Sequence, residues 1–317
     1  MQVIRGLHNL RPEHRGCVMT IGNYDGVHLG HRAILQRMRV EADQRGLPVL
    51  VTVFEPTPKE FFCPQVAPPR LASLREKLED LSACGVDRVL CLPFTPALAQ
   101  LPAEQFVQDV IVDGVGAKLV AIGDDFRFGR ERAGNFELLQ QLGSTLGFEV
   151  QQQDCERLAG ERVSSTAVRA YLAEGQPHKA AAMLGQPWRI SGRVQLGRQL
   201  GRTLDIPTAN IALGLRKAAK PAARLGVYAV TVNGLGQALN GVANLGFRPT
   251  VAGEGCLLEV HLFDFNQDIY GQRLSVGMMH FLRAEQKFAS VDALKAAMQN
   301  DIQQAKAFFS AREGGGA

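Results

Sequence analysis

The chain has 317 residues, of which 46% are hydrophobic and 21% charged, and its formal net charge is +4. This length and composition are typical of folded protein with room for two domains, and they exclude a disordered or fibrous chain. The basic residues are scattered rather than gathered in a run, so the charge gives no case for nucleic acid, although anionic nucleotides remain compatible with it.

The first predicted unit runs from residue 17 to residue 45. Residues 17–21 form an apolar run typical of a buried strand, and residues 31–45 carry apolar side chains with helical spacing. Between them lies the glycine-rich stretch IGNYDGVHLGH. Glycines let the backbone approach a ligand, and a helix N-terminus offers free amide donors and a positive dipole end. We therefore predict a phosphate-like anion close to Gly22, Gly26 and Gly30.

His28 and His31 are three residues apart, so on the first turn of a helix their imidazoles would face the same way. Two such donors suit a phosphate whose charge grows during a reaction. Three other interpretations stay open: a solvent-facing pair, a core histidine bonded to backbone, and two ligands of a metal site. The metal interpretation lacks further ligands, because no HExxH motif or cysteine cluster accompanies the pair.

Strand and helix patterns then alternate up to residue 153. The stretch from Glu55 to Arg70 holds five prolines and is predicted to be an irregular loop. The other predicted elements are strands at 49–54, 88–92, 118–122 and 147–153, a helix opened by a capping box at Ser73, and helices at 103–112 and 135–146. These units predict a parallel sheet with helices on both faces and a ligand site at the carboxyl ends of its strands. No GxGxxG fingerprint is present, which argues against an NAD dehydrogenase.

Two later polar stretches are candidate ligand contacts. The loop 123–130, GDDFRFGR, is in plain terms a polar turn with two aromatic anchors, and it lies at the same predicted sheet edge as the glycine turn. The stretch 162–169, RVSSTAVR, opens a helix, where hydroxyl side chains are most often N-caps. Three adjacent hydroxyls between two arginines exceed what a cap needs. Together with helix-start amides, they suit a triphosphate.

The pattern changes near residues 184–187. Short alternating segments separated by glycine turns follow, and they predict a small antiparallel β-barrel. These segments are 188–194, 227–232, 238–245, 257–263 and 274–281. An amphipathic helix from Val291 to Phe309 should pack on the barrel. We predict domains at 1–184 and 185–311, and a flexible tail at 312–317.

The compartment is predicted from what the chain lacks. The start, MQVIRGLHNL, has no signal-peptide core, and no run approaches the ~20 apolar residues of a membrane helix. The six cysteines form no CxxC pair and are expected to be reduced thiols. We expect a cytoplasmic protein without membrane contact. A monomer and a weak homo-oligomer both stay open.

GNYDGVHLGH resembles the HxGH signature of the nucleotidyltransferase superfamily, in the GxFDGVHxGH form of bacterial bifunctional riboflavin kinase/FAD synthetases, with Tyr24 in place of the usual Phe. GDDFRFG and RVSSTAVR resemble two further motifs of that family. The resemblance implies that His28 and His31 are catalytic and that Phe126 and Phe128 contact flavin. It implies nucleotide or phosphate contacts at Gly22, Asp25, Gly26, Gly30, Asp125, Arg162, Ser165, Thr166 and Arg169.

The second half is similar to the riboflavin kinase module of the same family. IPTAN, GVANLGFRPTV, LEVHLFDFNQDIYG and LRAEQKF carry that similarity, and Asp205 replaces the usual glycine before PTAN. By resemblance Glu259 is the general base, worth ~10²–10⁴ in rate. Thr208 and Asn210 offer oxygen ligands to Mg²⁺. Gly192, Gly197 and Arg202 would contact phosphate, and Arg283 and Glu285 would contact flavin.

The resemblance therefore implies phosphorylation of riboflavin to FMN by ATP in the barrel, then adenylylation of FMN to FAD with release of pyrophosphate in the first domain. Both steps need Mg²⁺, because these transfers depend on positioning and charge neutralisation. A nucleotide or flavin sensor without turnover is the rival hypothesis. The set His28, His31, Thr208, Asn210 and Glu259 argues against it, because a pure binder would not need it. A milder rival is an enzyme with only one working site. In that case Asp205 makes the kinase site the one expected to be lost.

Overall fold

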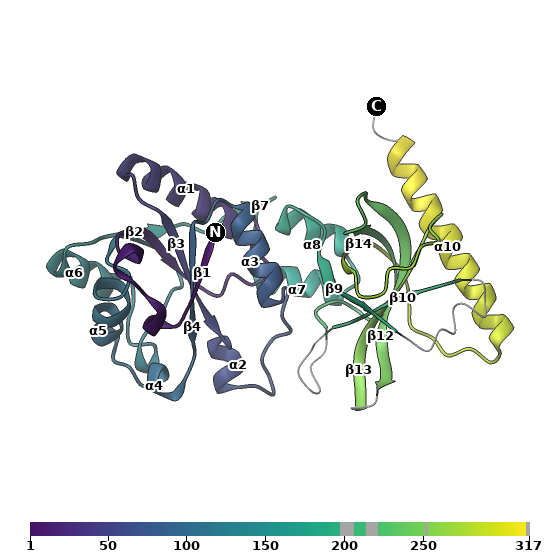
Figure 1. Ribbon diagram of the computed structural model, residues 1–317, viewed down its shortest axis with the longest axis horizontal. Helices are drawn as coiled ribbons and strands as arrows, with labels where there is room; N and C mark the ends of the chain where they lie inside the picture. The colour runs from purple at the N-terminus through teal and green to yellow at the C-terminus, as the bar shows by residue number, and fades with distance from the viewer. Residues whose placement is uncertain (197–205, 214–220, 251–252, 315–317) are drawn as a thin grey trace. The chain divides into compact units, whose positions relative to one another are not determined.

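The computed structural model describes residues 1–196, 206–213, 221–250 and 253–314. The chain divides into two compact units (Figure 1). The first consists of residues 1–68 and 73–164, and the second of residues 69–72 and 165–317. The segment 69–72 thus leaves the first unit and packs in the second.

The first unit is built on a six-stranded sheet whose order is β1-β4-β3-β2-β5-β6, and every neighbouring pair is parallel. The strands are β1 (Gln2–Arg5), β2 (Cys17–Ile21), β3 (Val49–Glu55), β4 (Arg88–Pro93), β5 (Ala117–Gly123) and β6 (Glu149–Gln153). The predicted parallel sheet is confirmed. The edge strand β1 was not predicted, because four residues carry too little pattern.

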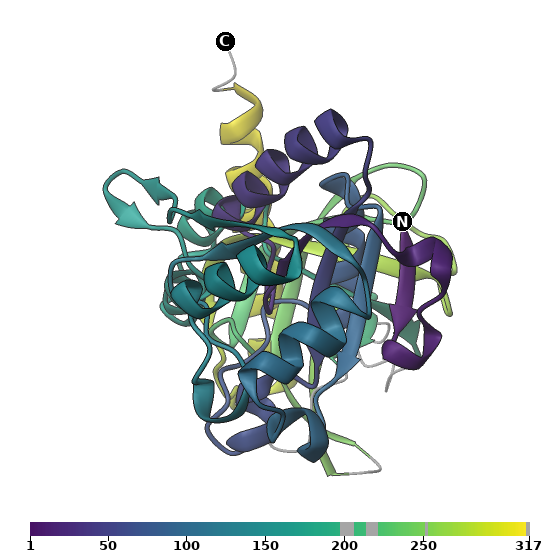
Figure 2. The same cartoon turned by 90° about the vertical axis from the view of Figure 1, so that its left-hand side faces the viewer.

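Helices cover both faces of this sheet (Figure 2). They are α1 (Leu29–Arg45), α2 (Pro58–Phe62), α3 (Leu74–Ala83), α4 (Pro96–Ala99), α5 (Ala103–Phe106), η3 (Val107–Val112) and α6 (Phe136–Leu146). Short 3₁₀ turns lie at η1 (Leu7–Asn9), η2 (Pro12–His14) and η4 (Arg130–Arg132), and β7 (Arg157–Leu158) pairs with β8 (Glu161–Arg162). Side chains of β2 alternate between the two cores: Met19 faces α5 and α6, and Val18 faces α1 and α3.

The prediction of an irregular loop from Glu55 to Arg70 was wrong at α2. Thr57 caps this helix and forms a capping box with Glu60, while Pro58 occupies its first turn. A proline is tolerated there, because the first-turn amides have no intrahelical acceptor. Pro58 therefore marks the start of a helix, although the prolines of this segment predicted an irregular loop.

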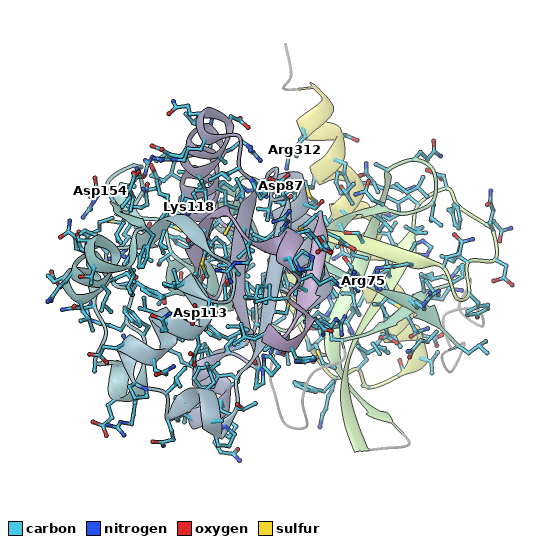
Figure 3. The ribbon with its side chains drawn as sticks, turned by 60° about the vertical axis from the view of Figure 1, so that its left-hand side comes forward. Arg75, Asp87, Asp113, Lys118, Asp154 and Arg312 are labelled. Carbon is cyan, nitrogen blue, oxygen red and sulfur yellow. The ribbon has the colours of Figure 1, made fainter. Side chains whose placement is uncertain are left out.

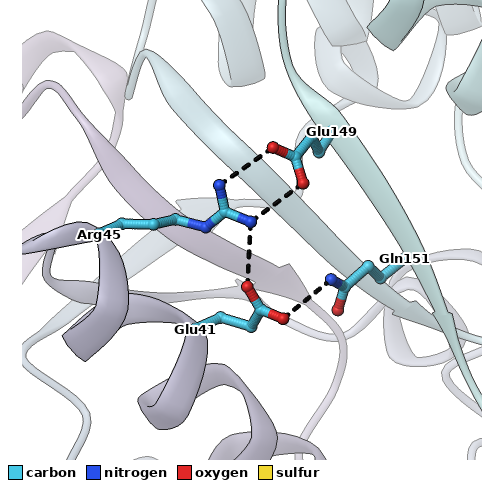
Figure 4. Close-up of polar contacts among 4 residues, drawn as sticks. All are labelled: Glu41, Arg45, Glu149 and Gln151. Atoms are coloured by element: carbon cyan, nitrogen blue, oxygen red, sulfur yellow. Dashed lines mark hydrogen bonds and ion pairs between the residues drawn. The ribbon is translucent and has the colours of Figure 1, made fainter.

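Polar contacts tie α1 to the sheet at two places, next to β3 and β4 through Arg39 and at β6 through Arg45. Asp87, labelled in Figure 3, accepts bonds from the Val49 amide at 2.8 Å and from Arg39 at 2.7 Å. At the C-terminal end of α1, Arg45 donates to both carboxylate oxygens of Glu149 on β6 at 3.0 Å and to Glu41, which also accepts from Gln151 (Figure 4). The helix that begins at the HxGH stretch is thus held along its length.

The second unit is a closed antiparallel barrel in the strand order β10-β13-β12-β11-β14-β9, which confirms the predicted barrel. Its elements are α7 (Ser165–Ala173), α8 (Pro177–Leu184), β9 (Arg189–Gln195), β10 (Ala209–Ala212), β11 (Gly226–Asn233), β12 (Leu239–Thr250), β13 (Gly253–Leu262), β14 (Arg273–Ala284) and α10 (Val291–Gly314). Ala305 of α10 is fully buried against Val227 and Val242 of the barrel. The described residues contain no helix long and apolar enough to cross a membrane.

Candidate functional site

The first candidate site lies at the start of α1, where β2 delivers the chain into a tight glycine turn. His28 is the N-cap residue, and its Nδ1 accepts a bond from the His31 amide at 3.3 Å. Because Nδ1 is the acceptor, the proton of the neutral ring lies on Nε2. The sequence thus places a neutral donor at the helix start.

The His31 ring stacks on that of His28, with centroids 3.7 Å apart and planes 16° apart. Tyr24 covers His31 with a centroid distance of 4.6 Å, and its hydroxyl donates to Thr20 Oγ1 at 2.9 Å. Burial lowers the pKa of His31 well below 6.5, and the neighbouring His28 imidazole and the charge of Lys77 lower it further. The predicted convergence of the two imidazoles is therefore present in the structure, and His31 is neutral at pH 7.

There is little room for a side chain on the glycines beside the histidines. A Cβ on Gly30 would lie 3.2 Å from His28 Nδ1, and one on Gly22 would lie 3.1 Å from the Tyr24 ring. Gly26 has φ +84°, which favours glycine. Asp25 is buried within the same turn. These residues shape the turn, and their contact with a nucleotide stays a prediction.

The third predicted stretch reaches the first unit through Arg162. Its guanidinium donates to Asp124 at 2.8 Å and lies 3.9 Å from Asp125, so β8 is tied to the loop after β5. Ser165 and Thr166 begin α7 in the second unit, where Arg169 donates to the Pro69 carbonyl at 2.7 Å. The structure therefore gives Arg169 a contact with the segment 69–72, and the phosphate role of these three residues stays a prediction.

The two predicted flavin contacts of the loop differ in exposure. Phe128 is only 6% exposed and packs against Phe106, with which its ring centroid distance is 5.7 Å. Phe126 stacks on Phe128 at 5.6 Å and stays partly exposed. Phe126 thus offers ring surface to a ligand, while Phe128 supports it from the core.

A partly exposed aromatic cluster lies at the carboxyl ends of β3 and β4. Phe61 and Phe62 of α2 contact Phe94 with centroids 5.2 and 5.6 Å apart, and Phe94 also contacts Phe54. Phe62 is 61% exposed. This cluster was not predicted from the sequence, because the segment after β3 was expected to be an irregular loop. The FF pair that follows the Thr-Pro cap was the available signal.

The second candidate site lies on the barrel wall. Asn210 of β10 and Asn244 of β12 are both register partners of Glu259 on β13, one on each side. Cross-strand partners project from the same face of a sheet. Thr208 precedes β10, and its carbonyl accepts from Asn210 Nδ2 at 3.4 Å. The structure therefore brings Asn210 and Glu259 together and adds Asn244, which was not predicted.

Three other predicted residues of the barrel have defined surroundings. Gly192 is buried, and a Cβ there would lie 2.4 Å from Ile211, so this glycine lets β9 and β10 approach each other. Arg283 donates to both carboxylate oxygens of Asp301 on α10 at 2.7 and 2.8 Å. Burial and the charge of Glu285 raise the pKa of Cys256 on β13 to about 11. Gly197, Arg202 and Asp205 lie outside the described residues.

Two family models match the chain. The FAD synthetase model covers residues 10–167, and the riboflavin kinase model covers residues 184–309. Fold and sites thus define a class of enzymes that join a nucleotidyltransferase unit to a flavokinase barrel.

The bifunctional riboflavin kinase/FMN adenylyltransferase of Pseudomonas fluorescens is 51% identical over 308 residues, which cover 97% of each chain. That of Escherichia coli K12 is 50% identical over 313 residues, or 98% of each chain. The chain belongs to the family of bifunctional riboflavin kinases/FMN adenylyltransferases.

A crystal structure from Streptococcus pneumoniae, described as a macrolide-efflux protein, matches with a TM-score of 0.80 at 29% identity. The match covers 95% of this chain and 97% of that one. It supports the fold, and its description is not carried to this chain.

Proposed function

We propose that the first unit transfers AMP from ATP to FMN with His28 and His31 as its catalytic donors. An oxygen of the FMN phosphate attacks the α-phosphorus of ATP, a new P–O bond forms, and pyrophosphate leaves. The FMN phosphate is already ionised, so no general base is required. The histidines stabilise charge that develops on the α- and β-phosphates.

The stacked, neutral histidine pair at the start of α1 is the observation that carries this proposal. His28 keeps its proton on Nε2, and His31 Nδ1 is buried without a hydrogen-bond partner among the described residues. Neutral imidazoles can donate to phosphate oxygens without adding a full charge to the buried turn. The helix N-terminus adds its dipole to the same anion.

We infer that Arg162 contacts the triphosphate of ATP, and phosphate contacts of Ser165, Thr166 and Arg169 remain part of the proposal. Phe126 and the aromatic cluster of Phe54, Phe61, Phe62 and Phe94 hold the flavin ring. The exposure of Phe62 supports this role, because a flat apolar ring would cover aromatic surface that otherwise faces water.

The barrel is proposed to phosphorylate riboflavin, with Glu259 as the base. Glu259 takes the proton of the 5′-hydroxyl while that oxygen attacks the γ-phosphorus of ATP, and ADP leaves. Thr208 and Asn210 provide neutral oxygen ligands for Mg²⁺, which suits a cation that also binds substrate phosphates. Bound Mg²⁺ neutralises phosphate charge in both reactions.

The proposal includes the boundaries 1–184 and 185–311 for the two functional domains and a cytoplasmic location. The gap between the two family models, residues 168–183, supports a boundary in this region. All six cysteines are free thiols.

His28→Ala and His31→Ala test the assignment of the two sites. Each variant should lose FAD formation by about 10²–10³, the usual cost of one transition-state donor. FMN formation from riboflavin should stay intact in the same preparation. Equal loss of both activities would contradict the two-site assignment.

A further inference from the structure

The outer wall of the barrel places a histidine next to the proposed kinase base. Along β13 the buried residues Leu258, Val260 and Leu262 alternate with Glu259 and His261, which are both partly exposed. Side chains two residues apart on a strand share a face. His261 therefore projects from the same face as Glu259, toward the strand β10 that pairs with β13.

The imidazole of His261 contacts the segment that leads into β10. Its Nδ1 lies 2.9 Å from the carbonyl oxygen of Pro207. A carbonyl oxygen can only accept, so Nδ1 carries the proton. The ring also lies near Phe263, at a centroid distance of 6.1 Å and an interplanar angle of 64°.

This bond fixes the peptide group that precedes Thr208. The Pro207 carbonyl and the Thr208 amide belong to one planar unit, so holding the oxygen also orients the amide and the start of the Thr208 side chain. Pro207 lies outside the ladder between β10 and β13, whose register begins at Ala209. The barrel pairing therefore does not itself set this peptide.

We propose that His261 is a positioning residue for riboflavin phosphorylation: it holds the Pro207–Thr208 peptide so that the Thr208 hydroxyl faces the phosphate and metal beside Glu259. This inference rests on the proposed roles of Thr208 and Glu259. It assigns His261 no proton transfer. Its contribution is geometric, and small displacements of a metal or phosphate ligand are costly in such sites.

The test compares His261→Leu with His261→Asn in the full chain. Leu removes the donor, whereas the Asn amide nitrogen can take the place of Nδ1. His261→Leu should lower kcat for FMN formation and raise the KM for Mg²⁺-ATP, with an overall loss of about 10–100-fold, as for other residues that orient ligands. The KM for riboflavin should change much less, and His261→Asn should recover most of the loss.

Two controls separate positioning from a general structural effect. FAD formation from supplied FMN is measured in the same samples and should stay unchanged. Thermal unfolding of the barrel should also be similar in both variants. Unchanged kinase kinetics in His261→Leu, or no recovery in His261→Asn, would overturn the proposal, as would a loss that follows the melting temperature alone.

Glu259→Gln distinguishes failure of this inference from failure of the proposed function. If Glu259→Gln abolishes FMN formation while His261→Leu is fully active, only the positioning role is overturned. If Glu259→Gln is itself active, the proposed kinase site is wrong, and the inference falls with it.

Discussion

The two candidate sites are assembled in different ways. In the first unit, Tyr24, His28 and His31 come from one turn and the start of one helix. In the barrel, Asn210, Asn244 and Glu259 come from three strands and meet only through the register of the ladder. A local site can be recognised in a short stretch of sequence, whereas a site made by register needs the fold.

The two sites also treat charge differently. The first uses a histidine pair next to the positive end of a helix dipole, in which burial keeps His31 neutral. The second sets a carboxylate between two amide side chains on a partly exposed wall. The first arrangement suits stabilisation of an anion. The second suits removal of a proton from a hydroxyl.

The largest effect is expected at Glu259. Glu259→Gln keeps the size of the side chain but removes its basicity, so FMN formation should fall by about 10²–10⁴. FAD formation from supplied FMN should be unchanged, because the histidine pair is complete in its own unit. Chromatography of the flavins measures both activities. A parallel fall of FAD formation would break the separation of the two sites.

An ion pair between Arg283 of β14 and Asp301 of α10 holds this helix on the barrel. Asp301 is 4% exposed and Arg283 23%, and they form a bidentate pair. Asp301→Ala would leave a largely buried guanidinium without its partner, so we expect the barrel to lose about 3–5 kcal/mol of unfolding free energy. Denaturant unfolding measures this, with Arg312→Ala on the exposed side of α10 as the control. An equal loss of unfolding free energy in the two variants would contradict this role of the Arg283–Asp301 pair.

The histidine site of the first unit should make the folding stability depend on pH. The pKa of His31 is lowered in the folded state, so below about pH 6.5 the unfolded chain binds a proton that the folded chain resists. Stability is therefore full above the unfolded pKa and falls as the pH decreases toward the lowered value. His31→Asn should remove this part of the loss. Melting temperatures between pH 7.5 and 5.5 test it, and parallel curves for both proteins would contradict it.

The smallest effect is expected at the far end of α1. Arg45→Ala removes the contacts with Glu41 and Glu149, which are largely at the surface, and should cost about 0.2–1 kcal/mol. FAD formation should stay close to that of the unchanged protein, because the histidines lie at the other end of the helix. A large loss of FAD formation would show that the local site depends on this anchor.

The alternation of strands β2 to β6 with longer helices and the histidine pair were predictable, because strand and helix periodicity and the HxGH spacing are local patterns. The short strand β10 was missed, because its residues Ala209–Ala212 begin within the PTAN motif and show no alternation. Asn244 gave no signal of its own, since only the register of β12 against β13 brings it beside Glu259. The bond of Arg169 to Pro69 could not be predicted from the sequence either, because it joins residues 100 positions apart.

The most direct test of the account is a time course with purified protein, riboflavin, ATP and Mg²⁺, in which the flavins are separated by chromatography. The account predicts that FMN appears first and FAD follows at its expense. Tight binding of riboflavin and FMN without turnover of either would contradict it and would favour a flavin sensor.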